Sequence, residues 1–168
     1  KCCSQNCFDI RSNFDNWDIS GTKVLTAGRK EKFVNGSKFI DKNNIISKFK
    51  VCTSKANGAA QEDNGTGKRV ISDAFVINPN EICNETYLVV NTFETLNEAE
   101  NFSKYMKTKF FRFMMSLRTP TQNISKTCFD WVPDFVNYSD SLNDQNLYNK
   151  YNFNEKEISY IESKIKEI

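Results

Sequence analysis

The sequence predicts a single α+β domain over residues 1–168, with short mixed or antiparallel strands and loops in its N-terminal half and helices in its C-terminal half. Up to residue 93, short β-branched and aromatic runs alternate with turns rich in Gly and Asn, which is typical of strands. From residue 95 onward, apolar residues recur every three or four positions, as they do on the buried face of a helix. A chain of 168 residues is long enough to bury one substantial core.

Strands are expected over residues 22–27, 32–34, 48–53, 69–77 and 86–93. A turn at 28–30 separates the first two strands, and Pro79 interrupts the chain between the last two. Residues 54–68 are rich in Gly, Asn and Ala and have no strand or helix pattern, so we expect an exposed loop there.

One long central helix is expected over about 96–117. Thr95 and Glu98 have the spacing of a capping box at its start, and Pro120 ends it. Its apolar face consists of Ala99, Phe102, Met106, Phe110, Phe113 and Leu117. A short helix is expected over 144–151, and a C-terminal helix over about 155–167 begins at the Asn154 cap.

Charge is strongly segregated along the chain, although the net charge is only +2. Residues 20–58 carry a net charge of +7 and residues 59–100 carry −6, whereas residues 101–129 carry +6 because they contain no acidic residue. If folding brings the two basic blocks onto one face, they form a positive surface of the kind that attracts nucleic acid.

Residues 101–129 interleave cations with aromatic residues and include the polar run Arg118–Asn123 (RTPTQN). Lys and Arg neutralise phosphates, whereas Arg, Gln and Asn can form paired hydrogen bonds with base edges. A structural interpretation of the same segment stays open. In that interpretation the aromatics form the core, and the lysines form the solvated rim of a helix whose dipole favours cations near its C-terminus.

Several classes of function are disfavoured by what the sequence lacks. It has no histidine, which removes Ser–His and Cys–His nucleophilic catalysis, and it contains no Walker loop and no GxGxxG motif. The six cysteines lack the spacing of a zinc site, so we expect no metal and reduced thiols in a cytoplasmic protein. No apolar run has the length of a membrane span, and no signal peptide is expected.

Three stretches, taken in order, resemble a known family. Residues 7–14 (CFDIRSNF) are similar to a Pro-Phe-Gly-Leu-Arg-Thr-Asn-Phe signature, and residues 50–58 (KVCTSKANG) are similar to a Lys-Val-x-x-Ser-Lys-Ala-x-Gly signature. The third stretch runs from 98 to 122, and a matching tail follows over 147–162. The ordered set resembles the C-terminal target-recognition region of bacterial restriction–modification adenine-specific DNA methyltransferases in which methylase and recognition regions share one chain.

The resemblance implies a division of labour within a longer protein, and the non-Met residue Lys1 also predicts that the chain is a fragment. The methylase domain, absent here, would bind S-adenosylmethionine, flip the target adenine out of the duplex and methylate its N6 atom. This chain would grip double-stranded DNA and select the site, with no cofactor and no catalytic residue of its own. The implied partners are double-stranded DNA, the N-terminal methylase domain and, as a further candidate, a restriction subunit, but no membrane.

We therefore assign candidate DNA contacts to two groups of residues. Phosphate contacts are expected from the cations Lys104, Lys107, Lys109 and Arg112. Base contacts are expected just past the helix end and on the 54–58 loop, from Arg118, Thr121, Gln122, Asn123, Lys55 and Asn57. A structural role for Arg118 and Gln122, as caps of helix carbonyls or as contacts to a neighbouring loop, stays open.

Two other functions also stay open. One is a scaffold that docks the methylase or a partner subunit and reads no bases, which buried aromatics and a long loop also suit. The other is an RNA-binding domain that stacks bases on Phe and Tyr side chains, which requires exposed aromatics on a sheet.

Overall fold

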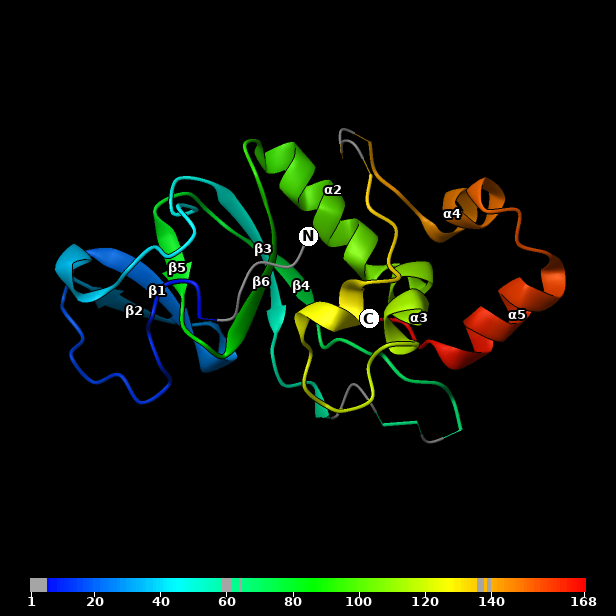
Figure 1. Ribbon diagram of the computed structural model, residues 1–168, viewed down its shortest axis with the longest axis horizontal. Helices are drawn as coiled ribbons and strands as arrows, with labels where there is room; N and C mark the ends of the chain where they lie inside the picture. The colour runs from blue at the N-terminus through cyan, green and yellow to red at the C-terminus, as the bar shows by residue number, and fades with distance from the viewer. Residues whose placement is uncertain (1–5, 59–61, 64, 136–137, 139) are drawn as a thin grey trace.

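A central antiparallel sheet separates two hydrophobic cores in the computed structural model (Figure 1). The structure describes residues 6–58, 62–63, 65–135, 138 and 140–168. The middle strand, β3 (Phe49–Ser54), pairs antiparallel with β4 (Ala74–Ile77) and with β6 (Tyr87–Phe93). Successive residues of a strand face opposite sides, so Val51 lies in one core and Cys52 in the other. The predicted α+β class is confirmed.

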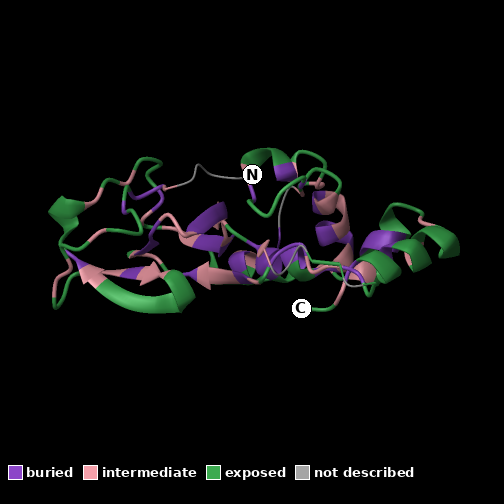
Figure 2. Ribbon diagram, turned by 90° about the horizontal axis from the view of Figure 1, so that it is seen from below, coloured by how far each residue is buried: buried purple, intermediate pink, exposed green. Residues whose placement is uncertain are grey.

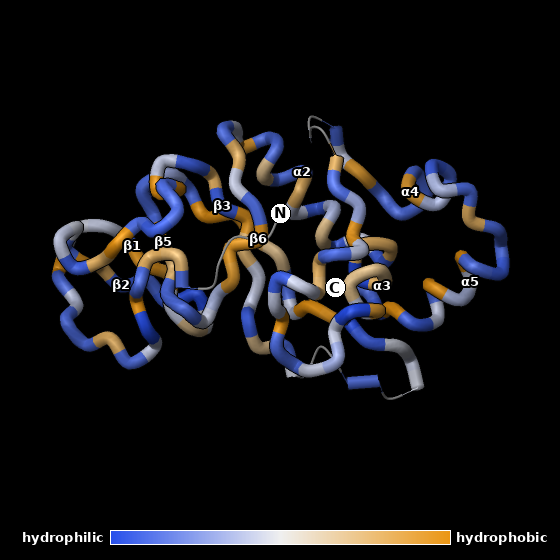
Figure 3. Tube along the Cα trace, viewed as in Figure 1, coloured by the Kyte–Doolittle hydropathy of each residue, from blue (hydrophilic) through white to orange (hydrophobic). Residues whose placement is uncertain are grey.

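Two helices, α2 (Leu96–Lys107) and α3 (Lys109–Ser116), form the helical layer, in which α2 packs on the central sheet. Buried residues concentrate where this layer meets the sheet (Figure 2), and hydropathy is highest along the strands (Figure 3). The apolar residues predicted to face the core are buried from Ala99 to Phe110, but Leu117 is 49% exposed because it lies beyond the end of α3.

The single long helix that the sequence predicts over about 96–117 is wrong, because α2 and α3 meet at a break at Thr108. This residue has extended backbone angles, and its hydroxyl accepts the N–H of Phe111 at 3.1 Å, which caps α3. The carboxylate of Asp144 accepts the first two N–H groups of α3 at 3.0 and 2.7 Å. Apolar spacing of three and four residues continues across the break, so periodicity alone does not reveal it.

A second, smaller sheet lies on the other side of the central sheet. It has the order β2–β1–β5, in which β1 (Thr22–Thr26) pairs antiparallel with β2 (Lys30–Val34) and parallel with β5 (Glu81–Cys83). The single-turn 3-10 helices η1 (Ala27–Arg29) and η2 (Gly36–Lys38) follow β1 and β2. The sequence did not predict β5, which has only three residues and is defined by its pairing with β1.

The predicted strand over 69–77 begins only at Ala74. The preceding residues are held by other partners: the carbonyl of Arg69 accepts from a buried arginine side chain, and the N–H of Ser72 donates to Asn57 at 2.7 Å. Val70 also has a positive φ of 72°, which is incompatible with a strand. These contacts fix residues 69–72 as a loop.

The C-terminal region adds η3 (Lys126–Phe129), α4 (Asp144–Lys150) and α5 (Glu155–Lys164). The predicted Asn154 cap at the start of α5 is confirmed, because its side chain accepts the N–H of Glu157 at 3.1 Å. The Glu157 carboxylate accepts the N–H of Asn154 at 2.8 Å in return, which completes a capping box. In Figure 1, α4 and α5 form one end of the molecule and β1 and β2 form the other.

The chain leaves α5 as an extended segment, so the C-terminal helix predicted over about 155–167 ends early, at Lys164. Ile165 forms a parallel bridge with Lys68. The N–H of Lys68 donates to the carbonyl of Lys164 at 2.9 Å, and the N–H of Lys166 donates to the carbonyl of Lys68 at 3.1 Å. These hydrogen bonds engage peptide groups that would otherwise continue the helix.

Within the described residues, no helix combines the length and the apolar character needed to cross a membrane. The same part of the chain contains no group of three or more His, Cys, Asp or Glu side chains that could hold a metal ion. Cys52, Cys83 and Cys128 are buried free thiols, Cys7 is also buried, and Cys2 and Cys3 lie outside the described residues.

Candidate functional site

Arg112, predicted to contact phosphate, is fully buried, and this assignment is therefore wrong. Its Nε donates to the carbonyls of Lys107 and Thr108 at 3.0 and 3.2 Å, and its Nη1 donates to the carbonyls of Arg69 and Lys166. Burial lowers the pKa of the guanidinium to about 10, so it keeps its charge at neutral pH. Arg112 therefore joins the helix break, the 69–72 loop and the C-terminal segment.

The predicted phosphate contacts Lys107 and Lys109 are both engaged in ion pairs inside the molecule. Lys107 lies 2.9 Å from Asp73. Lys109 pairs with Glu162 and Glu167, and its side chain is only 14% exposed. Burial alone would lower the pKa of Lys109, but its bonds to the two carboxylates outweigh burial and raise it. The helices therefore do not present the row of free cations that the sequence predicts.

Lys104 is the exception in this group. It is exposed on α2, and no carboxylate among the described residues lies within 4 Å of its ammonium group. Lys104 therefore keeps the role that the sequence assigns to it as a candidate phosphate contact, but without its predicted neighbours.

The first basic block, residues 20–58, is also largely engaged within the molecule. Lys23, Lys38 and Lys48 pair with acidic side chains at 2.7–3.4 Å. Lys50 is fully buried, donates to the carbonyl of Lys48 at 2.7 Å, and has its pKa lowered to about 8 by burial. The β1–β2 hairpin of this block lies at one end of the molecule in Figure 1, so the two basic blocks do not form one continuous positive face.

The two loops that carry the predicted base contacts are hydrogen-bonded to each other. The N–H of Asn57 donates to the carbonyl of Gln122 at 2.9 Å, and the N–H of Ile124 donates to the carbonyl of Lys55 at 2.9 Å. Asn123 forms an antiparallel bridge with Ala56 between them. Folding therefore brings together residues that lie more than 60 positions apart in the sequence.

Asn57 itself is only 3% exposed, and its predicted role in base contact is wrong. Its Oδ1 accepts the N–H and the hydroxyl of Ser72, both at 2.7 Å, and its Nδ2 donates to the carbonyl of Ser54. The hydrogen bonds of this side chain thus hold the 54–58 loop against Ser72. Asn57 therefore helps to position the 54–58 loop, which pairs with residues 121–124.

Thr121, Gln122 and Asn123 are exposed. The hydroxyl of Thr121 accepts the N–H of Asn123 at 3.3 Å, which shapes the turn. Among the described residues, no hydrogen bond engages the side-chain amides of Gln122 and Asn123. A Cβ at Gly58 would lie 3.0 Å from Oε1 of Gln122, so this exposed side chain lies against the 54–58 loop.

Arg118 lies next to this turn and is partly engaged. Its guanidinium lies 3.3 Å from Asp130 and 5.1 Å from the ring centre of Trp131, and its side chain is still 40% exposed. A depression of about 430 Å³ extends from Arg118 to Thr121 and Asn123. An exposed ion pair of this kind is worth at most about 1 kcal/mol, so an incoming anion or base can compete for the guanidinium.

Three cations near the hydrogen-bonded loops 54–58 and 121–124 were not predicted from the sequence: Lys68, Arg69 and Lys166. Their backbone is fixed by the bridge to the C-terminal segment and by Arg112. No described carboxylate lies within 4 Å of their side-chain nitrogens. Lys68 and Arg69 form an adjacent basic pair in the sequence, but the acidic excess of residues 59–100 concealed them.

We use the name joined-loop edge for the segments 54–58, 67–69, 118–124 and 164–166. The hydrogen bond between Asn57 and Ser72 connects the 54–58 loop to the chain that follows residues 67–69. The loops around these segments lie along the lower border of the molecule in Figure 1. This edge combines cations without acidic partners and free side-chain amides, which is the chemistry that binds phosphates and base edges.

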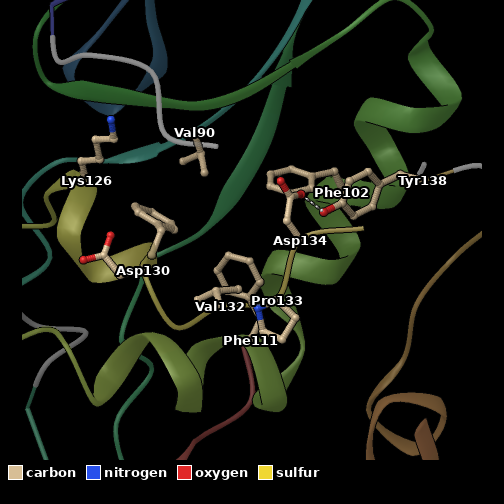
Figure 4. Close-up of a pocket in the computed structure, with 10 residues that line it drawn as sticks. Val90, Phe102, Phe111, Lys126, Asp130, Val132, Pro133, Asp134 and Tyr138 are labelled. Atoms are coloured by element: carbon tan, nitrogen blue, oxygen red, sulfur yellow. Dashed lines mark hydrogen bonds between the residues drawn. The ribbon is translucent and has the colours of Figure 1, made fainter. Parts of the chain in front are cut away.

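A separate apolar pocket of about 380 Å³ lies between β6, the helices and the chain around η3 (Figure 4). Its walls include Phe102, Phe111 and Tyr138, and the hydroxyl of Tyr138 donates to Asp134 at 2.8 Å. Burial raises the pKa of the Tyr138 phenol. Most of the side chains that line the pocket are apolar, so its geometry suits binding of an apolar group.

Comparison with known proteins finds no family model, no curated protein and no solved structure that matches this chain.

Proposed function

We propose that this chain is a double-stranded-DNA-binding module that selects the target site of an adenine-N6 methyltransferase in a restriction–modification system. The resemblance of the 7–14, 50–58 and 98–122 stretches to that family supports the proposal. The observation that carries it is the hydrogen-bonded pairing of loop 54–58 with loop 121–124, because it gathers the predicted base contacts on one exposed edge.

Two kinds of residue on the joined-loop edge bind DNA, one through phosphates and the other through base edges. Lys68, Arg69 and Lys166 contact phosphates and set the register of the duplex, because no described carboxylate pairs with them. Arg118, Thr121, Gln122, Asn123 and Lys55 lie where base edges can be read. An Arg, Gln or Asn paired with a base edge contributes about 1–3 kcal/mol of discrimination against the wrong base.

The chemistry of methylation lies outside this chain in the proposal. A methylase domain elsewhere in the parent protein would bind S-adenosylmethionine and hold the flipped adenine. The described residues contribute orientation of the duplex only, because the joined-loop edge contains no general base of the kind that a reacting group needs.

The chief rival is a docking scaffold, and the exposed side chains of Leu117 and Trp131 beside the joined-loop edge favour it. An RNA-binding sheet receives less support. Side chains of the central sheet lie in the two cores that flank it, and its four aromatics belong to these cores or pack against them: Phe49, Phe75, Tyr87 and Phe93. The sheet therefore offers no open aromatic platform among the described residues.

The test is binding of the 168-residue chain to a pool of fluorescent duplexes with a randomised centre, followed by sequencing of the bound fraction. We expect enrichment of one short motif over the starting pool. We also expect log K to fall linearly with log salt, at about 0.9 for each phosphate contact. A scaffold gives no binding at low salt. An RNA-binding domain binds single-stranded RNA of the same length more tightly than the duplex pool.

A further inference from the structure

Trp131 is an aromatic residue that the sequence analysis did not assign to any site, and it lies at the border of the joined-loop edge. It is 51% exposed, although a tryptophan ordinarily buries most of its large apolar surface. The guanidinium of Arg118 lies 5.1 Å from its ring centre. About half of the surface of this residue is therefore exposed.

The neighbours of Trp131 indicate which ligand suits it. Leu117, 49% exposed, lines the same depression as Arg118, Thr121 and Asn123. Asp130, the residue before Trp131 in the sequence, is paired with Arg118 at 3.3 Å. An exposed aromatic and an exposed aliphatic side chain therefore lie beside hydrogen-bonding groups, and the local carboxylate is neutralised.

We propose that Trp131, supported by Arg118, is a stacking platform for an unstacked nucleobase of the bound DNA. This inference rests on the proposed DNA-binding function. Every base has a π-face that can lie on an indole, and arginine adds a cation–π contribution to such a stack. An aliphatic wedge such as Leu117 beside the platform is the type of side chain that separates base steps. Asn123, whose side-chain amide can pair with a base edge, lines the depression that begins at Arg118, the residue that contacts the indole.

The other exposed aromatics do not share this combination. Tyr160 is 56% exposed and lies near Lys164, 5.6 Å from its ring centre, but it belongs to the middle of α5 and packs edge-on against Phe113. It has an aromatic ring and a cation, but the depression that it lines with Phe153 and Lys156 contains no side-chain amide. Tyr160 therefore serves as the matched control for Trp131.

The experiment uses the full 168-residue chain and two fluorescent duplexes of the same sequence, one fully paired and one with a single extrahelical base. For Trp131→Ala, we expect about 5- to 100-fold weaker binding of the duplex with the extrahelical base. Binding of the fully paired duplex changes by less than about twofold, and Tyr160→Ala changes neither duplex by more than that. Trp131→Phe retains most of the affinity, because phenylalanine also presents a π-face.

A second readout reports the contact directly. Trp17 and Trp131 are the only tryptophans, and Trp17 lies against the other core, beside Phe14 at 4.7 Å. In the Trp17→Phe variant all tryptophan emission comes from Trp131. We expect stronger quenching of this emission by the duplex with the extrahelical base than by the paired duplex at equal saturation.

The outcomes separate the two proposals. Equal affinity of Trp131→Ala and wild type for both duplexes, with equal quenching, overturns the platform and leaves duplex binding intact. Failure of the wild-type chain to bind either duplex at low salt overturns both the platform and the proposed function.

Discussion

The α2–α3 helices and the joined-loop edge contain the same types of cation in very different settings. On the helices, Lys107 and Lys109 neutralise acids, and Arg112 donates to backbone carbonyls in the interior. At the joined-loop edge, Lys68 and Lys166 have fixed backbones and side chains without described acidic partners. The comparison teaches that a dense basic segment in a sequence can be structural, whereas sparse cations on hydrogen-bonded loops supply the free charge.

Arg112→Ala tests the helix side of this comparison and has the largest expected effect. Because four carbonyls lose their donor and a cavity forms, we expect the free energy of unfolding to fall by about 3–5 kcal/mol. Urea denaturation followed by circular dichroism measures this change. The control is Lys104→Ala on the exposed side of α2, which should change stability by less than about 0.5 kcal/mol. Equal stability of the two variants would show that Arg112 is not a structural tie.

Lys50 extends the comparison between buried and exposed cations, because it is a second cation buried among carbonyls. Burial lowers its pKa to about 8 in the folded state, whereas the unfolded value is 10.5. Between these values the unfolded chain binds more protons, so the contribution of Lys50 to stability rises with pH. From pH 8 to 10.5, wild type should gain about 2–3 kcal/mol relative to Lys50→Met. A constant stability difference in parallel urea titrations across this range would show that the ammonium is solvated.

Arg118→Ala tests the loop side of the comparison. If Arg118 pairs with a base edge, its loss should reduce discrimination at one position of the selected motif by about 1–3 kcal/mol. Sequencing of the bound fraction from the randomised duplex pool measures this loss, and Gln122→Ala provides a second position on the same turn. An unchanged motif for both variants would restrict Arg118 to its ion pair with Asp130.

Thr108→Ala has the smallest expected effect and tests how the helix break is held. Loss of the hydroxyl that accepts the N–H of Phe111 should lower the free energy of unfolding by about 1 kcal/mol. Thr95→Ala removes the corresponding cap of α2, where the hydroxyl accepts the N–H of Glu98 at 3.3 Å, and serves as a comparison. A stability gain in Thr108→Ala would indicate that the chain favours one continuous helix.

The architecture was accessible from the sequence wherever local patterns decide it. Strand alternation placed β1, β3 and β6 within one or two residues, and polar spacing identified the caps at Thr95 and Asn154. Features that depend on distant partners were not accessible. The break at Thr108 depends on Asp144, and the early end of α5 depends on Lys68.

In the candidate site too, the sequence predicted what local side-chain types decide and not what distant partners decide. The sequence indicated Arg118, Thr121, Gln122 and Asn123 because their side-chain types suit base edges, and the structure places them together on an exposed turn. It could not distinguish Arg112 from a surface arginine, since an arginine at a helical position looks the same whether its partners are phosphates or carbonyls. Two of the four carbonyls that hold Arg112 come from residues 43 and 54 positions away.

The difference between the two regions is tested most directly by the salt dependence of duplex binding for two double variants with equal charge changes. Lys68→Ala/Lys166→Ala removes two cations from the joined-loop edge, and Lys104→Ala/Lys107→Ala removes two from α2. We predict that the loop variant lowers the slope of log K against log salt by about 2, whereas the helix variant lowers it by less than about 1. A larger decrease for the helix variant would contradict the assignment of the joined-loop edge as the DNA-binding surface.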